Sequence, residues 1–176
     1  MEKTLFRKTL LGIILTGIFG TLLHFVYQWS GQNKWIAPFC AVNESTWEHL
    51  KLLFIPCFVL FLIEYFLTKR EFSGLLTRRI QGLLCGLAFI PVAFYTYTGI
   101  VGRSCMAADI ILFIAAVLIT WIGSHRFYQK CEELRKNSIV FILILLFLMF
   151  LFIWFTFRPP HITLFIDPLD LTFGVS

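Results

Sequence analysis

Residues 43–67 read NESTWEHLKLLFIPCFVLFLIEYFL, and this stretch decides how the rest of the chain is interpreted. Residues 43–51 hold the densest group of ionisable side chains beside any apolar segment, and an apolar run starts at Leu50. A bilayer core about 30 Å thick needs about 20 predominantly apolar residues in a helix, and residues 50–67 come close to that length. The stretch therefore predicts a membrane helix with a cluster of polar groups at its beginning.

The composition of the whole chain indicates the same class of protein. Hydrophobic residues make up 59% of the 176 residues, and the mean hydropathy is +0.83, which is not the profile of a water-soluble globule. The net charge of +5 comes from Lys and Arg in short clusters between apolar runs, a pattern typical of loops that orient membrane helices. We therefore expect a polytopic protein surrounded by the lipid bilayer, and no nucleic-acid partner.

Five segments are long and apolar enough to cross a bilayer. The predicted fold is an all-α integral membrane protein, a single domain over residues 1–176, with transmembrane helices at roughly 9–29, 50–67, 80–100, 106–123 and 138–157. The first segment begins with basic residues like a signal peptide, but its apolar part is longer than the apolar region of such peptides. We therefore interpret it as an uncleaved first helix.

The loops predict the orientation, because Lys and Arg are retained on the cytoplasmic side. Eleven of the 15 basic residues fall on one side, namely Lys3, Arg7, Lys8, Lys69, Arg70, Arg78, Arg79, Arg126, Lys130, Arg135 and Lys136. The other four fall on the opposite side, namely Lys34, Lys51, Arg103 and Arg158. We expect the N-terminus inside and the C-terminus outside.

The last predicted helix and the residues after it differ in character. Residues 138–157 contain no Gly or Ala and are nearly all Leu, Ile and Phe, which is typical of a helix that faces lipid. Arg158-Pro159-Pro160 ends this helix. The outer tail, residues 158–176, is apolar, so we expect it to fold over the outer face of the bundle as a lid.

The polar cluster permits two interpretations. Ser45 and Glu48 fit a capping box, in which Ser45 bonds the backbone of residue 48 and Glu48 reaches back to the cap. On a helix, Glu44, Glu48 and Lys51 would also share one face, and two carboxylates four residues apart repel unless a cation lies between them. Lys51 can supply that cation in an ion pair, or a metal ion can, with His24 or His49 completing the ligands.

Other segments bring polar residues to the same side of the membrane. Gly12, Thr16, Gly20 and His24 recur every four residues on the first helix, and Gly82 and Gly86 begin a similar face that continues to Tyr97 on the third. Small residues at this spacing let helices approach closely, so we expect these faces to contact protein and to permit a homo-oligomer, and we expect Tyr97 to point into the bundle toward His24. Asp109, at the start of the fourth helix, is expensive to expose to lipid and is expected to face the bundle or to cap its helix.

We therefore predict an outward-facing polar pocket and assign its residues as follows. The predicted catalytic residues are Glu48, Asp109 and Tyr97; the residues predicted to bind substrate or an ion are Glu44, Lys51 and Arg158; the predicted metal ligands are His24, Glu48, His49 and His161. Carboxylate and imidazole ligands suit a divalent ion such as zinc or manganese.

Several stretches resemble an uncharacterised family of small bacterial integral membrane proteins. These stretches are LHFVYQWSG at 23–31, VNESTWEHLK at 42–51, YTYTG at 95–99, RPPH at 158–161 and Asp167-Pro168, so the resemblance covers nearly the whole chain. It implies a multi-pass protein of the bacterial plasma membrane, but no activity. A fainter resemblance links residues 43–50 to membrane hydrolases like the progestin and adiponectin receptors, which have seven helices and a late paired-histidine motif that is absent here.

Three classes of function remain open. The pocket could hydrolyse or transfer a group on a lipid-type substrate, bind a cation or proton in a small transporter or sensor, or serve only the structure of an accessory subunit. Cys40 and Cys105 both fall in outer loops, where disulfides persist, so they form the one plausible bridge, and free cysteines are the alternative. An ion pair is expected between Glu64 and Lys69 or Arg70.

Overall fold

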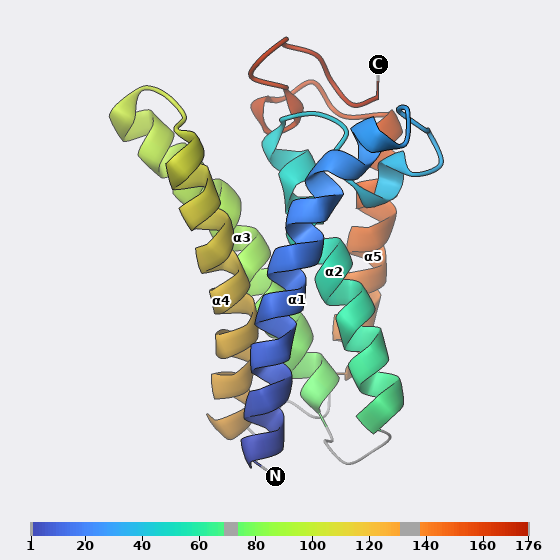
Figure 1. Ribbon diagram of the computed structural model, residues 1–176, viewed down its shortest axis with the longest axis vertical. Coiled ribbons are helices and arrows are strands. Elements are labelled where there is room, and N and C mark those ends of the chain that lie inside the picture. Colours follow the sequence, from blue (N-terminus) through green and yellow to red (C-terminus); the bar gives the residue numbers. More distant parts are fainter. Residues whose placement is uncertain (1, 69–73, 131–137, 176) are drawn as a thin grey trace.

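The computed structural model describes residues 2–68, 74–130 and 138–175 and consists of five long helices (Figure 1). They are α1 (Glu2–Trp29), α2 (Thr46–Thr68), α3 (Leu75–Val101), α4 (Met106–Lys130) and α5 (Ser138–Phe157). Two short 3-10 turns lie outside the helices: η1 (Ala37–Phe39) between α1 and α2, and η3 (Thr163–Phe165) in the C-terminal tail. Each of the five helices contains a segment long and apolar enough to cross a membrane. The predicted five-helix, all-α membrane fold is therefore confirmed.

The helix boundaries differ from the prediction at most ends. α1 begins at Glu2 instead of residue 9, α2 at Thr46 instead of 50, and α4 continues to Lys130 instead of 123, whereas α5 has the predicted bounds. Apolar composition marks only the part of a helix that lies in hydrocarbon. The polar turns beyond that part are helical too, so hydropathy alone made these helices too short.

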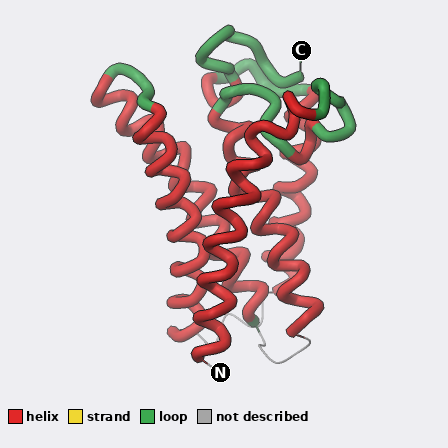
Figure 2. The backbone as a smooth tube through the Cα atoms, viewed as in Figure 1, coloured by secondary structure: helices red, strands yellow, loops and turns green. Residues whose placement is uncertain are grey.

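The five helices form two groups that separate at one end (Figure 1). α1, α2 and α5 stay together under the loops and the C-terminal tail, whereas the far tips of α3 and α4 lean away from them. Figure 2 shows that long loops gather at this end, which we call the loop end, opposite the end where the chain begins. α2 lies at the centre, since half of its apolar window is buried, against 17–22% for the other four helices.

The glycine faces pack within the chain. A Cβ atom at Gly82 would lie 2.2 Å from the carbonyl oxygen of Thr120, and one at Gly86 would lie 2.2 Å from the hydroxyl oxygen of the same residue. Gly12 and Gly20 are equally close to side chains or backbone of other helices. These faces were expected to contact protein, and they contact other helices of the same chain. A homo-oligomer stays a prediction, and it would have to use other surfaces.

The C-terminal tail folds back onto the loop end, as predicted. Phe165 is buried against Trp47, with 4.8 Å between their ring centroids, and Trp47 is equally close to Phe152 of α5. Asp167 is also buried, although it lies in an irregular segment. The aromatic contacts hold the tail against the beginning of α2.

At the opposite end, a buried Arg79 joins α3 to three other helices. Its guanidinium donates to Glu64 at 2.9 and 3.2 Å and also contacts the hydroxyls of Thr9 and Ser124. Glu64 was expected to pair with residue 69 or 70, but both lie outside the described residues, and its partner in the described part is Arg79. Glu64 lies on α2 and Arg79 on α3, so their proximity depends on how the two helices pack and could not be inferred from the sequence.

Of the two alternatives for Cys40 and Cys105, a disulfide or free thiols, the structure shows free thiols. Cys40 is fully buried and its thiol donates to the carbonyl of Ile36 at 3.3 Å, whereas Cys105 is exposed at the tip between α3 and α4. Burial raises the pKa of the Cys40 thiol to about 11, so it stays protonated at neutral pH. Cys40 and Cys105 were assigned to the same side of the membrane, but they do not meet, because the tips of α3 and α4 lean away from the other helices (Figure 1).

Candidate functional site

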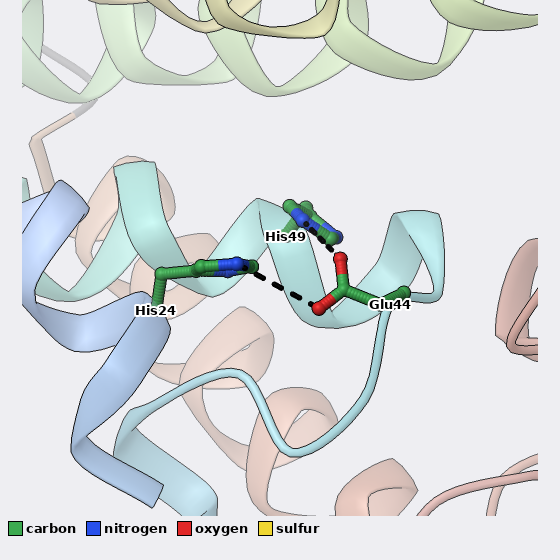
Figure 3. A group of neighbouring side chains, drawn as sticks. All are labelled: His24, Glu44 and His49. Atoms are coloured by element: carbon green, nitrogen blue, oxygen red, sulfur yellow. Dashed lines mark ion pairs between the residues drawn. The ribbon is translucent and has the colours of Figure 1, made fainter. Parts of the chain in front are cut away.

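Three side chains converge at the loop end: His24 from the last turns of α1, Glu44 from the loop before α2, and His49 from the first turn of α2 (Figure 3). His24 Nε2 lies 3.6 Å from Glu44 Oε1, and His49 Nε2 lies 3.5 Å from Glu44 Oε2. One ligand atom from each residue lies within 4.8 Å of the other two. We call His24, Glu44 and His49 the His/Glu/His group.

The beginning of α2 explains why Glu44 joins this group. Ser45 caps the helix by accepting the Glu48 N–H at 3.3 Å, and its own N–H donates to Asn43 Oδ1 at 3.1 Å. α2 therefore begins at Thr46, and Glu44 lies outside the helix. The expected stacking of Glu44 on Glu48 along one helix face is wrong for this reason. Glu44 is instead free to turn back toward the two imidazoles.

The tail holds the backbone of Glu44 in place. The Glu44 N–H donates to Asp167 Oδ2 at 2.9 Å, and the Asn43 side chain contacts the carbonyl of Gly174 at 3.4 Å. The other carboxylate oxygen of Asp167 accepts the N–H of Leu169 at 2.7 Å. We did not assign Asp167 to the site from the sequence. Its separation from Glu44 by more than 100 residues leaves no local signal, although the polar residue in an apolar tail is conspicuous.

The hydrogen bond of His49 constrains its ring. Nδ1 lies 2.9 Å from the carbonyl oxygen of Ser45, which can only accept, so Nδ1 carries a proton. In a neutral imidazole the other nitrogen, Nε2, then presents a lone pair. That nitrogen faces a carboxylate oxygen of Glu44 at 3.5 Å, and two acceptors repel at this distance. Either a second proton makes His49 an imidazolium, or a cation lies between the two residues.

His24 meets the same carboxylate from the other side. Its ring contacts the ring of His49, with 5.2 Å between centroids, and its Nδ1 is buried without a hydrogen-bond partner among the described residues. Side-chain exposure is 28% for His24, 40% for Glu44 and 34% for His49, so the group is accessible. Three ligand atoms are thus near one point, with room for further ligands.

A cavity of about 180 Å³ opens beside the group. Its polar lining comes from Glu44, Thr46, His49, Ser104 and Asp109; its apolar lining comes from Ile90, Phe94, Leu112, Phe113, Pro168 and Leu169. The lining residues belong to the beginning of α2, to α3 and α4, and to the tail. The tail contributes two of these residues, Pro168 and Leu169, to the cavity wall.

Asp109 and Tyr97 form a pair on the α3–α4 side of this cavity. The Tyr97 hydroxyl donates to Asp109 Oδ1 and accepts the N–H of Cys105 at 3.3 Å. We expected Tyr97 to point toward His24, but it points to Asp109 because both lie near the tip where α3 turns into α4. The cavity brings Asp109, and not Tyr97, to the wall shared with Glu44 and His49.

Glu48 and Lys51 lie apart from the His/Glu/His group and bind each other. Their charged atoms are 2.5 Å apart, and exposure is 0% for Lys51 and 2% for Glu48. Glu48 also accepts the Val42 N–H at 3.1 Å, and Lys51 donates to the Ala37 carbonyl at 3.1 Å and to the Thr156 hydroxyl at 2.7 Å. Glu48 was expected to reach back to the cap and to bind a metal, but Lys51 and Val42 engage its carboxylate instead.

Two further residues that we assigned to the pocket are also placed elsewhere. His161 is exposed and stacks on Phe173, with 4.6 Å between ring centroids. Arg158 lies over the ring of Trp154, 5.4 Å from its centroid. Both belong to the tail, as predicted, but the tail presents Asp167 and Leu169 to the site instead.

The distances in the His/Glu/His group are close to those of a metal centre. Ligand atoms about 2.0–2.1 Å from a tetrahedral zinc ion are roughly 3.3 Å from each other. The two imidazole-to-carboxylate distances, 3.6 Å to Oε1 and 3.5 Å to Oε2, are near this value. One ligand atom from each of the three residues lies within 4.8 Å of the others, so the side chains would have to move closer together to bind one ion. A metal-ligating histidine usually donates its other N–H to a carbonyl or carboxylate, and His49 does so to Ser45.

Comparison with known proteins identifies a family. The sequence model of a family of unknown function, DUF6512, matches residues 2–175, which is nearly the whole chain. No curated protein and no solved structure matches the chain.

Proposed function

The chain belongs to the family of unknown function DUF6512, and we propose that it binds a divalent metal ion at His24, Glu44 and His49. The observation that carries this proposal is the convergence of three ligand atoms within 4.8 Å of one another, from two helices and a loop. We further propose that the protein lies in the bacterial plasma membrane and that the site faces outward.

A divalent ion would resolve the electrostatics of the group. The fixed Nδ1–H of His49 leaves Nε2 and the Glu44 carboxylate facing each other as two acceptors. A cation between them turns this repulsion into two favourable contacts, and His24 Nε2 can supply a third. Two imidazoles and one carboxylate suit zinc, manganese or iron. Three protein ligands with an open position are typical of catalytic zinc sites, whereas structural sites have four.

We propose hydrolysis or group transfer as the chemistry of this site. A divalent ion with three protein ligands lowers the pKa of water and polarises a carbonyl or phosphoryl oxygen. Asp109 lines the same cavity as Glu44 and His49, so it can take a proton from a nucleophile there, and Tyr97 orients its carboxylate through their hydrogen bond. Glu48 has no part in this proposal, because Lys51 neutralises it.

The apolar side of the cavity supports a lipid-type substrate. Ile90 and Phe94 belong to one apolar span, Leu75–Val101, and Leu112 and Phe113 belong to another, Met106–His125. A substrate with its polar group at Glu44 and His49 would therefore rest its apolar part against helix surfaces at membrane depth.

Metal binding can be measured on detergent-purified protein. We expect about one zinc or manganese per chain after loading and dialysis, and about a 100-fold or greater loss of affinity in His49→Ala or Glu44→Ala, because each removes a ligand. His161→Ala is the matched control, since this exposed histidine stacks on Phe173 outside the group, and it should retain the metal. Elemental analysis and competition with a chelator give the values. A wild-type protein without stoichiometric metal would remove the proposal.

Activity on membrane lipids is tested separately from metal binding. We expect Asp109→Asn to lower turnover of extracted lipids by about 10²–10⁴-fold, which is the usual contribution of a general base, while metal content stays unchanged. Leu112→Trp should fill the cavity and have a similar effect, whereas Leu118→Trp on the exposed side of α4 should not. Mass spectrometry of the lipids gives the turnover.

The result separates the classes of function. Equal turnover in Asp109→Asn and wild type would contradict the role of Asp109. Metal binding without lipid turnover, together with a cation flux in reconstituted vesicles, would instead indicate a small transporter.

A further inference from the structure

We propose that the end of the bundle opposite the loop end binds the phosphate group of an anionic phospholipid headgroup, between Lys3, Arg7 and His125. These three residues and Phe6 line a second cavity of about 380 Å³. Lys3, Phe6 and Arg7 belong to the first turns of α1, and His125 belongs to α4. This proposal is independent of the metal site, which lies at the other end of the same helices.

The packing of α1 against α4 brings the three polar residues together. A Cβ atom at Gly12 would lie 2.3 Å from the ring of Trp121, so the two helices are in close contact there. The helices run in opposite directions (Figure 1), so His125, one turn beyond Trp121, lies level with residues that precede Gly12. Lys3 and Arg7 are four residues apart and share one helix face. The close contact at Gly12 therefore fixes the spacing of the cavity walls.

The charges around this cavity favour an anion. Two cations four residues apart on a helix repel each other. The ion pairs seen between described side chains involve other residues: His24, Glu44, Glu48, His49, Lys51, Glu64 and Arg79. His125 Nδ1 is buried and has no hydrogen-bond partner in the described part of the chain. His125 also lines the cavity, so a phosphate group there would accept from the ammonium, the guanidinium and an imidazole N–H, and would remove the repulsion.

The surroundings favour a lipid as the source of the phosphate. Phe6 is 59% exposed, and Leu10 and Ile14 continue the apolar surface of α1 at 48% and 50% exposure, one turn apart each. The apolar span of α1 begins at Lys3, so the cavity lies at the edge of the membrane. Basic pockets between helices on the cytoplasmic side bind lipid headgroups, and the predicted orientation puts this end inside. Acyl chains would then lie along α1.

Native mass spectrometry can measure this preference. The protein is reconstituted in phosphatidylcholine with a minor fraction of phosphatidylglycerol, and the retained lipids are compared. We expect wild type to retain phosphatidylglycerol preferentially and K3Q/R7Q to lower the preference about 25-fold, since each basic residue near a membrane surface contributes roughly fivefold. The control K34Q/R103Q removes the same charge from exposed residues near the loop end and should keep the preference.

A second variant guards against a change of topology, because Lys3 and Arg7 also orient the first helix. His125→Leu removes the imidazole that lines the cavity without altering that signal, and it should lower the preference severalfold. An equal loss in K34Q/R103Q, or no loss in K3Q/R7Q and His125→Leu, would overturn the proposal. Displacement of the lipid by inorganic phosphate or glycerol phosphate would keep the phosphate site but assign it to a soluble ligand.

Discussion

Replacing Lys51 by Met should lower the free energy of unfolding by about 3–5 kcal/mol, because it leaves the Glu48 carboxylate buried without its charged partner. The two residues are 0% and 2% exposed, so water cannot replace the lost contact. Met is close to Lys in length, and packing around the side chain should change little. The effect therefore measures the unpaired charge.

The Glu48–Lys51 pair also connects three parts of the chain. Lys51 donates to the carbonyl of Ala37 in the loop after α1 and to the hydroxyl of Thr156 in α5, and Glu48 accepts the N–H of Val42. Loss of the pair should thus loosen the loop that carries Glu44. We expect weaker metal binding in Lys51→Met as a secondary effect, without any contact between Lys51 and the metal.

The measurement is thermal or denaturant-induced unfolding in detergent, with the double variant Glu48→Leu/Lys51→Met as the control. Removing both charges leaves no unpaired ion, and replacing a whole buried pair by apolar residues is often neutral or stabilising. The double variant should therefore recover most of the stability. A Lys51→Met protein as stable as wild type, within about 1 kcal/mol, would contradict the role of the pair.

Gly82→Val should destabilise the contact between α3 and α4 by about 3 kcal/mol, at the upper end of the usual cost of overpacking. A Cβ atom at Gly82 would lie 2.2 Å from the backbone oxygen of Thr120 and 2.9 Å from the Cβ of Ser124. Backbone cannot rotate away as a flexible side chain can, so the helices must separate. The site should suffer too, because Asp109 is carried by α4.

Gly17→Val is the matched control for this substitution. It makes the same change in the middle of a membrane helix, but nothing lies within 4 Å of a Cβ atom at Gly17. Unfolding of the two variants in one detergent separates the close helix contact from the general effect of valine in a helix. Equal destabilisation of both variants would show that the approach of α3 to α4 is not limited by Gly82.

The sequence indicated which types of residue form the candidate site, but it did not indicate which of the candidate residues meet there. His24, Glu44 and His49 were all expected at the same end of the bundle, and they do meet. Glu48 was also expected among the ligands, because a continuous helix would put it over Glu44. The Ser45 cap begins the helix after Glu44, so Glu44 and Glu48 do not share a helix face. The buried Lys51 engages Glu48 instead. A single cap thus decides which carboxylate faces the histidines.

The predicted pairings failed where they depended on distance between helices. Cys40 and Cys105 share a predicted side, but Cys105 lies at the tip of α3 and α4, which leans away from α1 and α2 (Figure 1). Tyr97 bonds to Asp109 instead of approaching His24 for the same reason. Predicted depth in a membrane fixes one coordinate of a residue and leaves its position in the plane open.

The membrane class, the five helices and their order follow from local composition, because the number of apolar residues needed to cross a bilayer is set by its thickness. The glycine spacing likewise indicated which helix faces are buried. The choice of Glu44 over Glu48, the seating of the tail through Asp167 and the cavity shared with Asp109 needed the folded chain. These features join residues that are far apart in sequence, and their contacts depend on how the helices tilt and where each one begins.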